Sequence, residues 1–249
     1  MASRRTSLAD ARAAFAAQSV VITDWAGRLT EHGLAEPSAA AGWTLRDVLA
    51  HLARSAQRLA ELARQPVPGA AITLGAYVAG YAEVAQDIAR RARDEAGDPR
   101  GWLVRATEEA LGATATADGA AVVRAPRGPL RLADFVLTRV IELVAHGHDL
   151  GVEPDREALQ LAARALAGAL AERLPGRAVE LRVPPVAAVQ LLEGTTHRRG
   201  TPPAVVETDP RSWLLLATGR LAWADALAAG RVVASGGRSD LSAYLPVLS

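Results

Sequence analysis

Apolar residues recur every three or four positions through much of the first two thirds of the chain, which is the spacing of amphipathic helices. Thr44 is placed to cap one such helix, and Asp47 stands where a carboxylate reaches back to the first turn. Residues 113–131 break the pattern with Gly, Thr and Pro, a β-like stretch at 121–123 and a turn at 126–128. Helices are predicted over residues 8–32, 44–65, 74–96, 99–112, 132–150 and 155–174.

The pattern changes after Pro175, where short stretches alternate apolar and polar residues as half-buried strands do. A helical half followed by mixed strands and helices predicts two domains. We expect a four-helix bundle over residues 1–154 and a smaller α/β domain, with its linking helix, over residues 155–249. Whether that helix belongs to the bundle is left open. Strands are predicted at 178–183, 186–192, 204–207 and 231–235, and helices at 209–218, 223–229 and 240–248.

Composition narrows the classes of function. The chain has 249 residues, a formal net charge of +1 and no cysteine. Disulfide scaffolds, thiolate zinc sites and cysteine nucleophiles are therefore excluded, and any thiol in its chemistry must arrive as a small molecule. The balanced charge favours neither nucleic acid nor anionic membrane as a partner. Without a long apolar run or the apolar segment of a secretory signal, the sequence predicts a cytoplasmic protein.

Candidate chemistry lies in the helix predicted over residues 132–150. Glu142 and His146 are four residues apart, so a carboxylate and an imidazole share one face of a largely apolar helix. That pair suits a borderline divalent cation. Such pairs also occur on ordinary solvent-facing helices, so the pair alone does not establish a metal site.

His51 is the natural third ligand, because it lies at the edge of the apolar stripe of the helix that begins after Thr44. Asp47, one turn earlier, could orient it or a neighbouring arginine. The alternative is a half-buried polar residue with no ligand role. Three ionisable groups that face a shared apolar core would be costly without a partner, which favours the metal.

Two segments carry a resemblance to a known family: Trp43-Thr44 through Asp47 to His51-Leu52, and Arg139 through Glu142 and His146 to Asp149. They resemble the mycothiol-dependent maleylpyruvate isomerase family, within the larger class of DinB-like metal-binding helical bundles. The resemblance implies that His51, Glu142 and His146 bind a divalent metal, usually zinc. Arg139 and Asp149 would then support the ligands, or would form ordinary salt bridges.

The C-terminal half is similar to the sterol-carrier-type domain, in the segments 213–220, 223–230 and 231–236. Such a domain often follows this bundle, and in the isomerase group an arginine of this region assists the active site. Arg220 is the matching position and is the candidate catalytic residue. The alternative is an arginine that interacts with the C-terminal dipole of a helix.

The resemblance implies an enzyme that activates mycothiol at the metal for addition to an electrophilic small molecule. A transient adduct would give cis–trans isomerisation of a maleylpyruvate-type substrate, and a persistent one would make the protein a thiol S-transferase. A lipid- or sterol-carrier-like binding protein is the second hypothesis, and a metal-bound member without turnover is the third. The sequence leaves monomer and homodimer equally open.

Overall fold

The computed structural model describes residues 5–79, 97–194 and 204–248, and these fall into two compact units. The first unit contains the described residues up to 72 and from 97 to 158, and the second contains 73–79 and the described residues from 159 onward. Each unit is described here by itself. The division falls inside the first turn of helix α8, which spans Arg156–Arg173.

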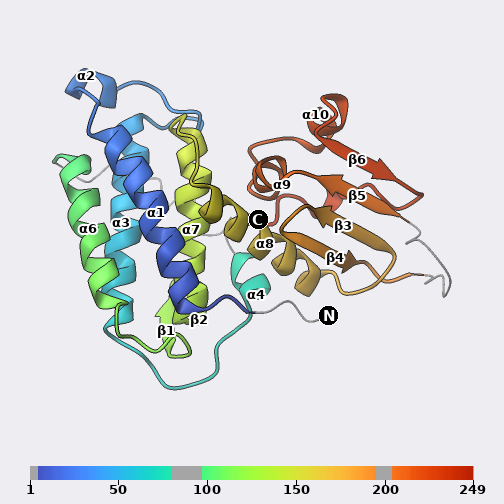
Figure 1. Cartoon of the computed structure of the whole chain (residues 1–249), viewed down its shortest axis with the longest axis horizontal. Coiled ribbons are helices and arrows are strands. Elements are labelled where there is room, and N and C mark those ends of the chain that lie inside the picture. The colour runs from blue at the N-terminus through green and yellow to red at the C-terminus, as the bar shows by residue number, and fades with distance from the viewer. Residues whose placement is uncertain (1–4, 80–96, 195–203, 249) are drawn as a thin grey trace. The chain divides into compact units, whose positions relative to one another are not determined.

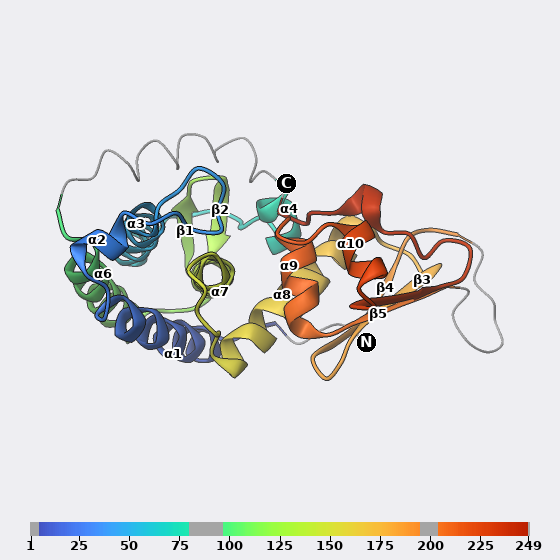
Figure 2. The same cartoon turned by 90° about the horizontal axis from the view of Figure 1, so that it is seen from above.

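Four long helices form the bundle of the first unit: α1 (Leu8–Ala26), α3 (Leu45–Ala63), α6 (Pro99–Ala113) and α7 (Leu132–Asp149). Helix α3 packs against both α6 and α7, and α1 packs against α7 and α6, so each helix has two neighbours around one apolar core (Figures 1 and 2). The short helix α2 (Glu31–Leu34) follows α1. The expected four-helix bundle is confirmed.

Local sequence signals set the starts of these helices. At α3 the Thr44 hydroxyl accepts the amide of Asp47 at 3.2 Å, while the Asp47 carboxylate accepts the Thr44 amide at 2.8 Å. This is the predicted capping box, and it satisfies amides that the first turn leaves open. Asp98 caps α6 by a single bond, its carboxylate accepting the Arg100 amide at 3.1 Å, with Pro99 at the first helical position.

A β-hairpin enters α7. Strand β1 (Val122–Ala125) pairs antiparallel with β2 (Gly128–Arg131). The turn uses Pro126 and Arg127, as the sequence predicts, and Gly128 adopts a φ of +132° that a side chain would strain. Because β2 runs directly into Leu132, the hairpin fixes where α7 begins.

The second unit holds a four-stranded mixed sheet in the order β4-β3-β5-β6. Strand β3 is antiparallel to β4 and parallel to β5, and β5 is antiparallel to β6. The helical elements of this unit are α4 and α8 before the first strand, α9 and α10 between β5 and β6, and the turn η1 after β6. The bounds are α4 (Leu74–Val78), β3 (Val179–Val183), β4 (Ala187–Leu191), β5 (Val205–Thr208), α9 (Pro210–Ala217), α10 (Trp223–Ala228), β6 (Val232–Ser235) and the 3₁₀ turn η1 (Ser242–Tyr244).

One face of this sheet forms the core of the second unit. Val179, Leu181 and Val183 alternate with half-exposed residues along β3 and are fully buried. Trp213 of α9 is also fully buried, and its indole N–H donates to the carbonyl of Ala163 in α8 at 3.0 Å. A buried indole N–H needs such a partner, so this contact ties α9 to α8 (Figure 1).

The fold class expected from the sequence is confirmed, and several element bounds differ. The predicted helix over 240–248 is wrong: only η1 forms, because Pro246 has no N–H to donate and Leu245 before it is extended. The first helix ends at Ala26 instead of His32, since Thr30 caps the separate helix α2. Of the helix predicted over 74–96, residues 74–78 are helical and 80–96 lie outside the described residues.

No helix in the described part of the chain combines the length and apolar character needed to span a membrane.

Candidate metal centre

The three side chains predicted as metal ligands come together in the bundle. His51 projects from α3, and Glu142 and His146 project from one face of α7. The His51 Nε2 atom lies 3.8 Å from Glu142 Oε2, and the two imidazole ring centres are 4.8 Å apart. Only 8% of the His51 side chain and 6% of the Glu142 side chain are exposed. Two helices thus bring two imidazoles and one carboxylate into one nearly dry space.

The carboxylate of Glu142 is ionised in spite of its burial. Burial by itself would raise the pKa of this carboxyl, but the charges of Arg139 and His51 and a hydrogen bond from Ser55 lower the pKa to about 2. Arg139 Nη2 lies 2.8 Å from Glu142 Oε1, and the Ser55 hydroxyl donates to Oε2 at 2.6 Å. Glu142 is therefore available as an anionic oxygen ligand.

The imidazole of His146 is oriented by a contact at its Nδ1 atom. Its Nδ1 atom lies 2.8 Å from the Asp149 carboxylate, which is 4% exposed. A carboxylate accepts, so Nδ1 carries the proton in this contact, and in the neutral ring Nε2 then presents its lone pair. This is the arrangement that carboxylates give to metal-binding histidines.

Trp43 forms a wall beside both imidazoles. Its ring is within 18° of parallel to His146 at 6.1 Å and meets His51 edge-on at 5.6 Å. The loop that carries it is fastened to the end of α7, because the Ala39 amide donates to the Asp149 carbonyl at 2.9 Å. A half-buried indole therefore covers one side of the imidazole pair.

The three candidate donors fit a divalent cation in part. Two ligands, each about 2.1 Å from a tetrahedral zinc, stand roughly 3.4 Å apart, and the 3.8 Å between His51 and Glu142 is close to this. As the side chains stand, however, no group of three or more His, Cys, Asp or Glu among the described residues is arranged to hold a metal ion. The types of donor, their low exposure and the Asp149 contact fit a borderline cation, and enclosing one requires the side chains to move.

Arg220 belongs to the second unit, whereas the three ligand candidates belong to the first. It follows the end of α9, after Gly219 with φ +73°, and its Nη1 donates to the Thr218 carbonyl at 3.2 Å. Its side chain is half-buried. The contact with a carbonyl at a helix end agrees with the helix-terminus alternative, and a catalytic role for Arg220 stays a prediction.

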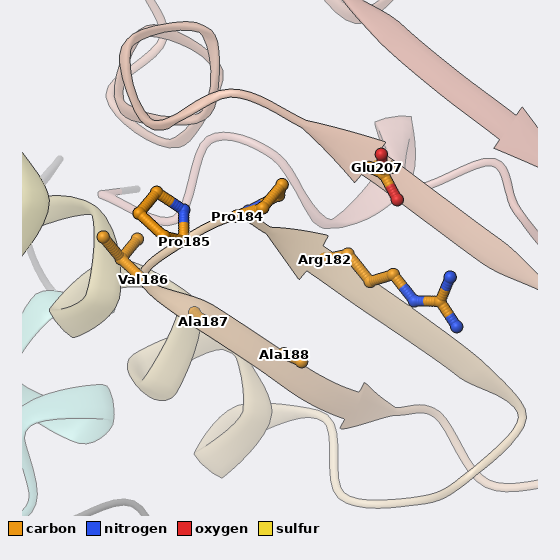
Figure 3. Close-up of a pocket in the computed structure, with 7 residues that line it drawn as sticks. All are labelled: Arg182, Pro184, Pro185, Val186, Ala187, Ala188 and Glu207. Carbon is orange, nitrogen blue, oxygen red and sulfur yellow. The ribbon is translucent and has the colours of Figure 1, made fainter.

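A hollow of 370 Å³ lies on the sheet of the second unit near the β3–β4 turn. It is lined by charged groups from β3 and β5 together with prolines and small residues, and it is not an apolar tunnel (Figure 3). The apolar residues of this unit, Trp213 among them, instead fill its core. The lining residues are Arg182, Pro184, Pro185, Val186, Ala187, Ala188 and Glu207.

Comparison with known proteins agrees with this geometry. The family model described as the mycothiol maleylpyruvate isomerase N-terminal domain matches residues 15–151, more than half of the chain. The chain belongs to this family. A second model, described as a bacterial SCP ortholog, matches residues 155–247. Both resemblances found in the sequence are thereby confirmed, and no curated protein matches the chain.

Two solved structures have the same fold as this family member over most of its length. The crystal structure of the mycothiol-dependent maleylpyruvate isomerase matches with a TM-score of 0.62 at 15% identity, covering 92% of this chain and 93% of that one. The structure of a histidine-to-alanine mutant of the mycothiol-dependent maleylpyruvate isomerase matches with a TM-score of 0.61 at 14% identity, with the same coverage. At this identity the likeness shows the fold alone.

The structure also shows a residue of the family member's site that the sequence interpretation missed. Ser55 stands one turn after His51 on α3 and hydrogen bonds to Glu142. The signal was its spacing of four residues from a ligand candidate, which places both on one helix face. Arg139 and Asp149, expected either as supports or as salt-bridge partners, contact Glu142 and His146 respectively.

Proposed function

We propose that this protein is a divalent-metal-dependent enzyme that activates mycothiol for addition to an electrophilic small molecule. His51, Glu142 and His146 would hold the cation, with zinc as its most suitable identity. The observation that carries the proposal is the meeting of these three donors from α3 and α7, with His51 and Glu142 buried and His146 half-buried, in a chain of this family. With no cysteine in the chain, the nucleophilic sulfur must come from a cosubstrate.

A bound divalent cation would lower the pKa of a coordinated thiol and so supply a thiolate near neutral pH. Side chains of this protein favour the binding of such a cation. Glu142 is ionised and can bind the cation as an anion. Asp149 keeps a proton of His146 on Nδ1, so that Nε2 is the nitrogen left for coordination. Low exposure of His51 and Glu142 limits competition from water.

The substrate class follows from the family. A thiolate that adds to a conjugated cis double bond forms a C–S bond, while the π electrons move onto the conjugated carbonyl as an enolate and leave a carbon–carbon single bond. Rotation about that bond and collapse of the enolate expel the same thiolate and give the trans isomer. If the adduct is stable, the reaction is an S-transfer. Arg220 is proposed to bind a substrate carboxylate, for which a guanidinium is suited.

Two measurements test the proposal. Elemental analysis of protein purified without added metal should find one equivalent of a divalent metal in the wild type and none in Glu142→Ala. The metal-loaded wild type, given mycothiol and maleylpyruvate or a general electrophile, should isomerise the substrate or consume the thiol. A wild type that binds no metal contradicts the metal-dependent function, and a loaded protein without either activity contradicts catalysis.

A further inference from the structure

Three residues form a closed hydrogen-bonded ring beside His51: Arg139, Ser55 and Glu142. Arg139 Nη1 donates to the Ser55 oxygen at 2.8 Å, and the Ser55 hydroxyl donates to Glu142 Oε2 at 2.6 Å. Arg139 Nη2 closes the ring on Glu142 Oε1 at 2.8 Å. Since a guanidinium only donates and a carboxylate only accepts, the direction of each bond is fixed.

The ring joins α3 to α7, and further contacts within α7 hold Arg139 in place. Arg139 Nε and Nη2 also donate to the Thr138 hydroxyl at 3.2 Å, and the guanidinium lies 4.8 Å from the centre of the Phe135 ring. Arg139 and Ser55 are each 7% exposed. A buried guanidinium held by a carboxylate, two hydroxyls and an aromatic face has little freedom to turn away.

The two oxygens of Glu142 are therefore not equivalent. Oε1 faces the positive guanidinium, which repels a second cation. Oε2 accepts the neutral Ser55 hydroxyl and is the oxygen that lies 3.8 Å from His51 Nε2. A cation shared with His51 can approach Oε2 and is kept from Oε1.

We propose that Arg139 and Ser55 are positioning residues that restrict Glu142 to one-oxygen ligation, an inference that rests on the proposed metal-dependent function. A carboxylate that used both oxygens would fill an extra coordination position. Restricting it to Oε2 keeps that position for the thiol or the substrate. The ring thus determines how many open positions the site offers.

Cobalt(II) is the probe for this inference, because its d–d absorption is stronger at low coordination number, and zinc affinity by chelator competition is the second readout. Ser55→Ala removes the hydroxyl that helps to hold the guanidinium at Oε1, and Arg139→Lys replaces the two-point contact with a flexible ammonium that can leave Oε1. Both variants should show weaker cobalt d–d absorption and about 10- to 100-fold lower zinc affinity. Ser55→Thr keeps the hydroxyl and should restore the wild-type spectrum.

Ser19→Ala is the matched control, since it removes another buried serine hydroxyl of the same bundle, on α1, and should leave both readouts unchanged. Circular dichroism establishes that each variant is folded, and Arg139→Lys carries the test if Ser55→Ala is not. Folded variants with a wild-type cobalt spectrum overturn the one-oxygen proposal while the metal-dependent function stands. A wild type that takes up no cobalt or zinc overturns both.

Discussion

Asp149 holds the Nδ1 atom of His146 at 2.8 Å from one turn farther along the same helix. The carboxylate is almost completely buried, so the contact is shielded from water. It assigns the proton to Nδ1 and, in the neutral ring, leaves the lone pair on Nε2 as the metal-binding position. Orientation of the imidazole is thus encoded within a four-residue stretch of α7.

Asp149→Asn is expected to weaken metal binding by about 10- to 100-fold. The amide can donate to Nδ1, which favours the tautomer with its proton on Nε2 and removes the ligand lone pair. Chelator competition measures the affinity. Asp134→Asn, at the start of the same helix, should bind as the wild type does, and an Asp149→Asn protein with unaltered affinity would refute the assigned tautomer.

Glu142→Gln is expected to destabilise the metal-free bundle by about 3–5 kcal/mol, because it leaves the buried guanidinium of Arg139 without its counter-charge. Urea unfolding measures the change. Glu61→Gln breaks a more exposed pair with Arg58 and should cost no more than about 1 kcal/mol. Recovery of stability in the double variant Glu142→Gln/Arg139→Met would tie the loss to the unpaired charge. An equal loss in Glu142→Gln and Glu61→Gln would contradict this explanation.

Trp213→Phe is expected to destabilise the second unit by about 1–3 kcal/mol. The substitution leaves the buried carbonyl of Ala163 without its indole donor and removes packed volume. Denaturant unfolding measures the loss. Metal content should stay at the wild-type value, since all three ligand candidates lie in the other unit, and loss of metal would show that the units are energetically coupled.

The lowered pKa of Asp209 predicts that the free energy of unfolding depends on pH. Partial burial opposes ionisation, but hydrogen bonds from Ser212 and Arg211 and the charge of Arg231 lower the pKa of this carboxyl below its usual 3.8. A lowered folded pKa means that the stabilisation is complete above about pH 3.8 and is lost as the pH falls through the folded value.

Asp209→Asn keeps a capping side chain and removes the titration. Its deficit in unfolding free energy relative to the wild type should therefore shrink as the pH falls below about 3.8, and urea midpoints from pH 2.5 to 7 measure this. Asp209→Ala removes the cap as well and should cost about 0.5–2 kcal/mol at neutral pH. A deficit for Asp209→Asn that is constant with pH would contradict the assignment.

Arg220→Met is expected to raise the KM for a carboxylate substrate while leaving metal content unchanged. The guanidinium would supply a charged hydrogen bond worth about 1.5–3 kcal/mol, or roughly a 10- to 150-fold change in kcat/KM. Steady-state kinetics measure it. Arg211→Met, elsewhere on the same unit, is the control. If both variants retain wild-type kinetics, the catalytic role of Arg220 is refuted.

The sequence predicted most of the architecture because helical spacing and capping residues are local signals. Thr44 with Asp47, and Asp209 before Pro210, each marked the helix start that the structure shows. His51, Glu142 and His146 were found through four-residue spacing and family motifs, and they do lie together, although a shared cation stays a prediction.

The missed features depend on tertiary contacts. Ser55 looks like any helical serine until α7 is packed beside it and brings Glu142 within 2.6 Å. The helix expected at 240–248 had apolar spacing in its favour, but Pro246 interrupts the backbone pattern. The end of α1 at Ala26 reflects competition from the Thr30 cap, which periodicity does not register.

The proposed ligands stand on the packed faces of α3 and α7, not on loops. Their separation therefore depends on how closely the two backbones approach, which in turn depends on the bulk of the buried side chains of these helices, Leu52 and Val140 among them. Exchanging one of these for a smaller or larger neighbour would move the imidazoles and the carboxylate relative to each other without touching any of them. Changes in the bundle's interior would in this way alter the metal-binding properties of the proposed site while the three ligand candidates stay unchanged.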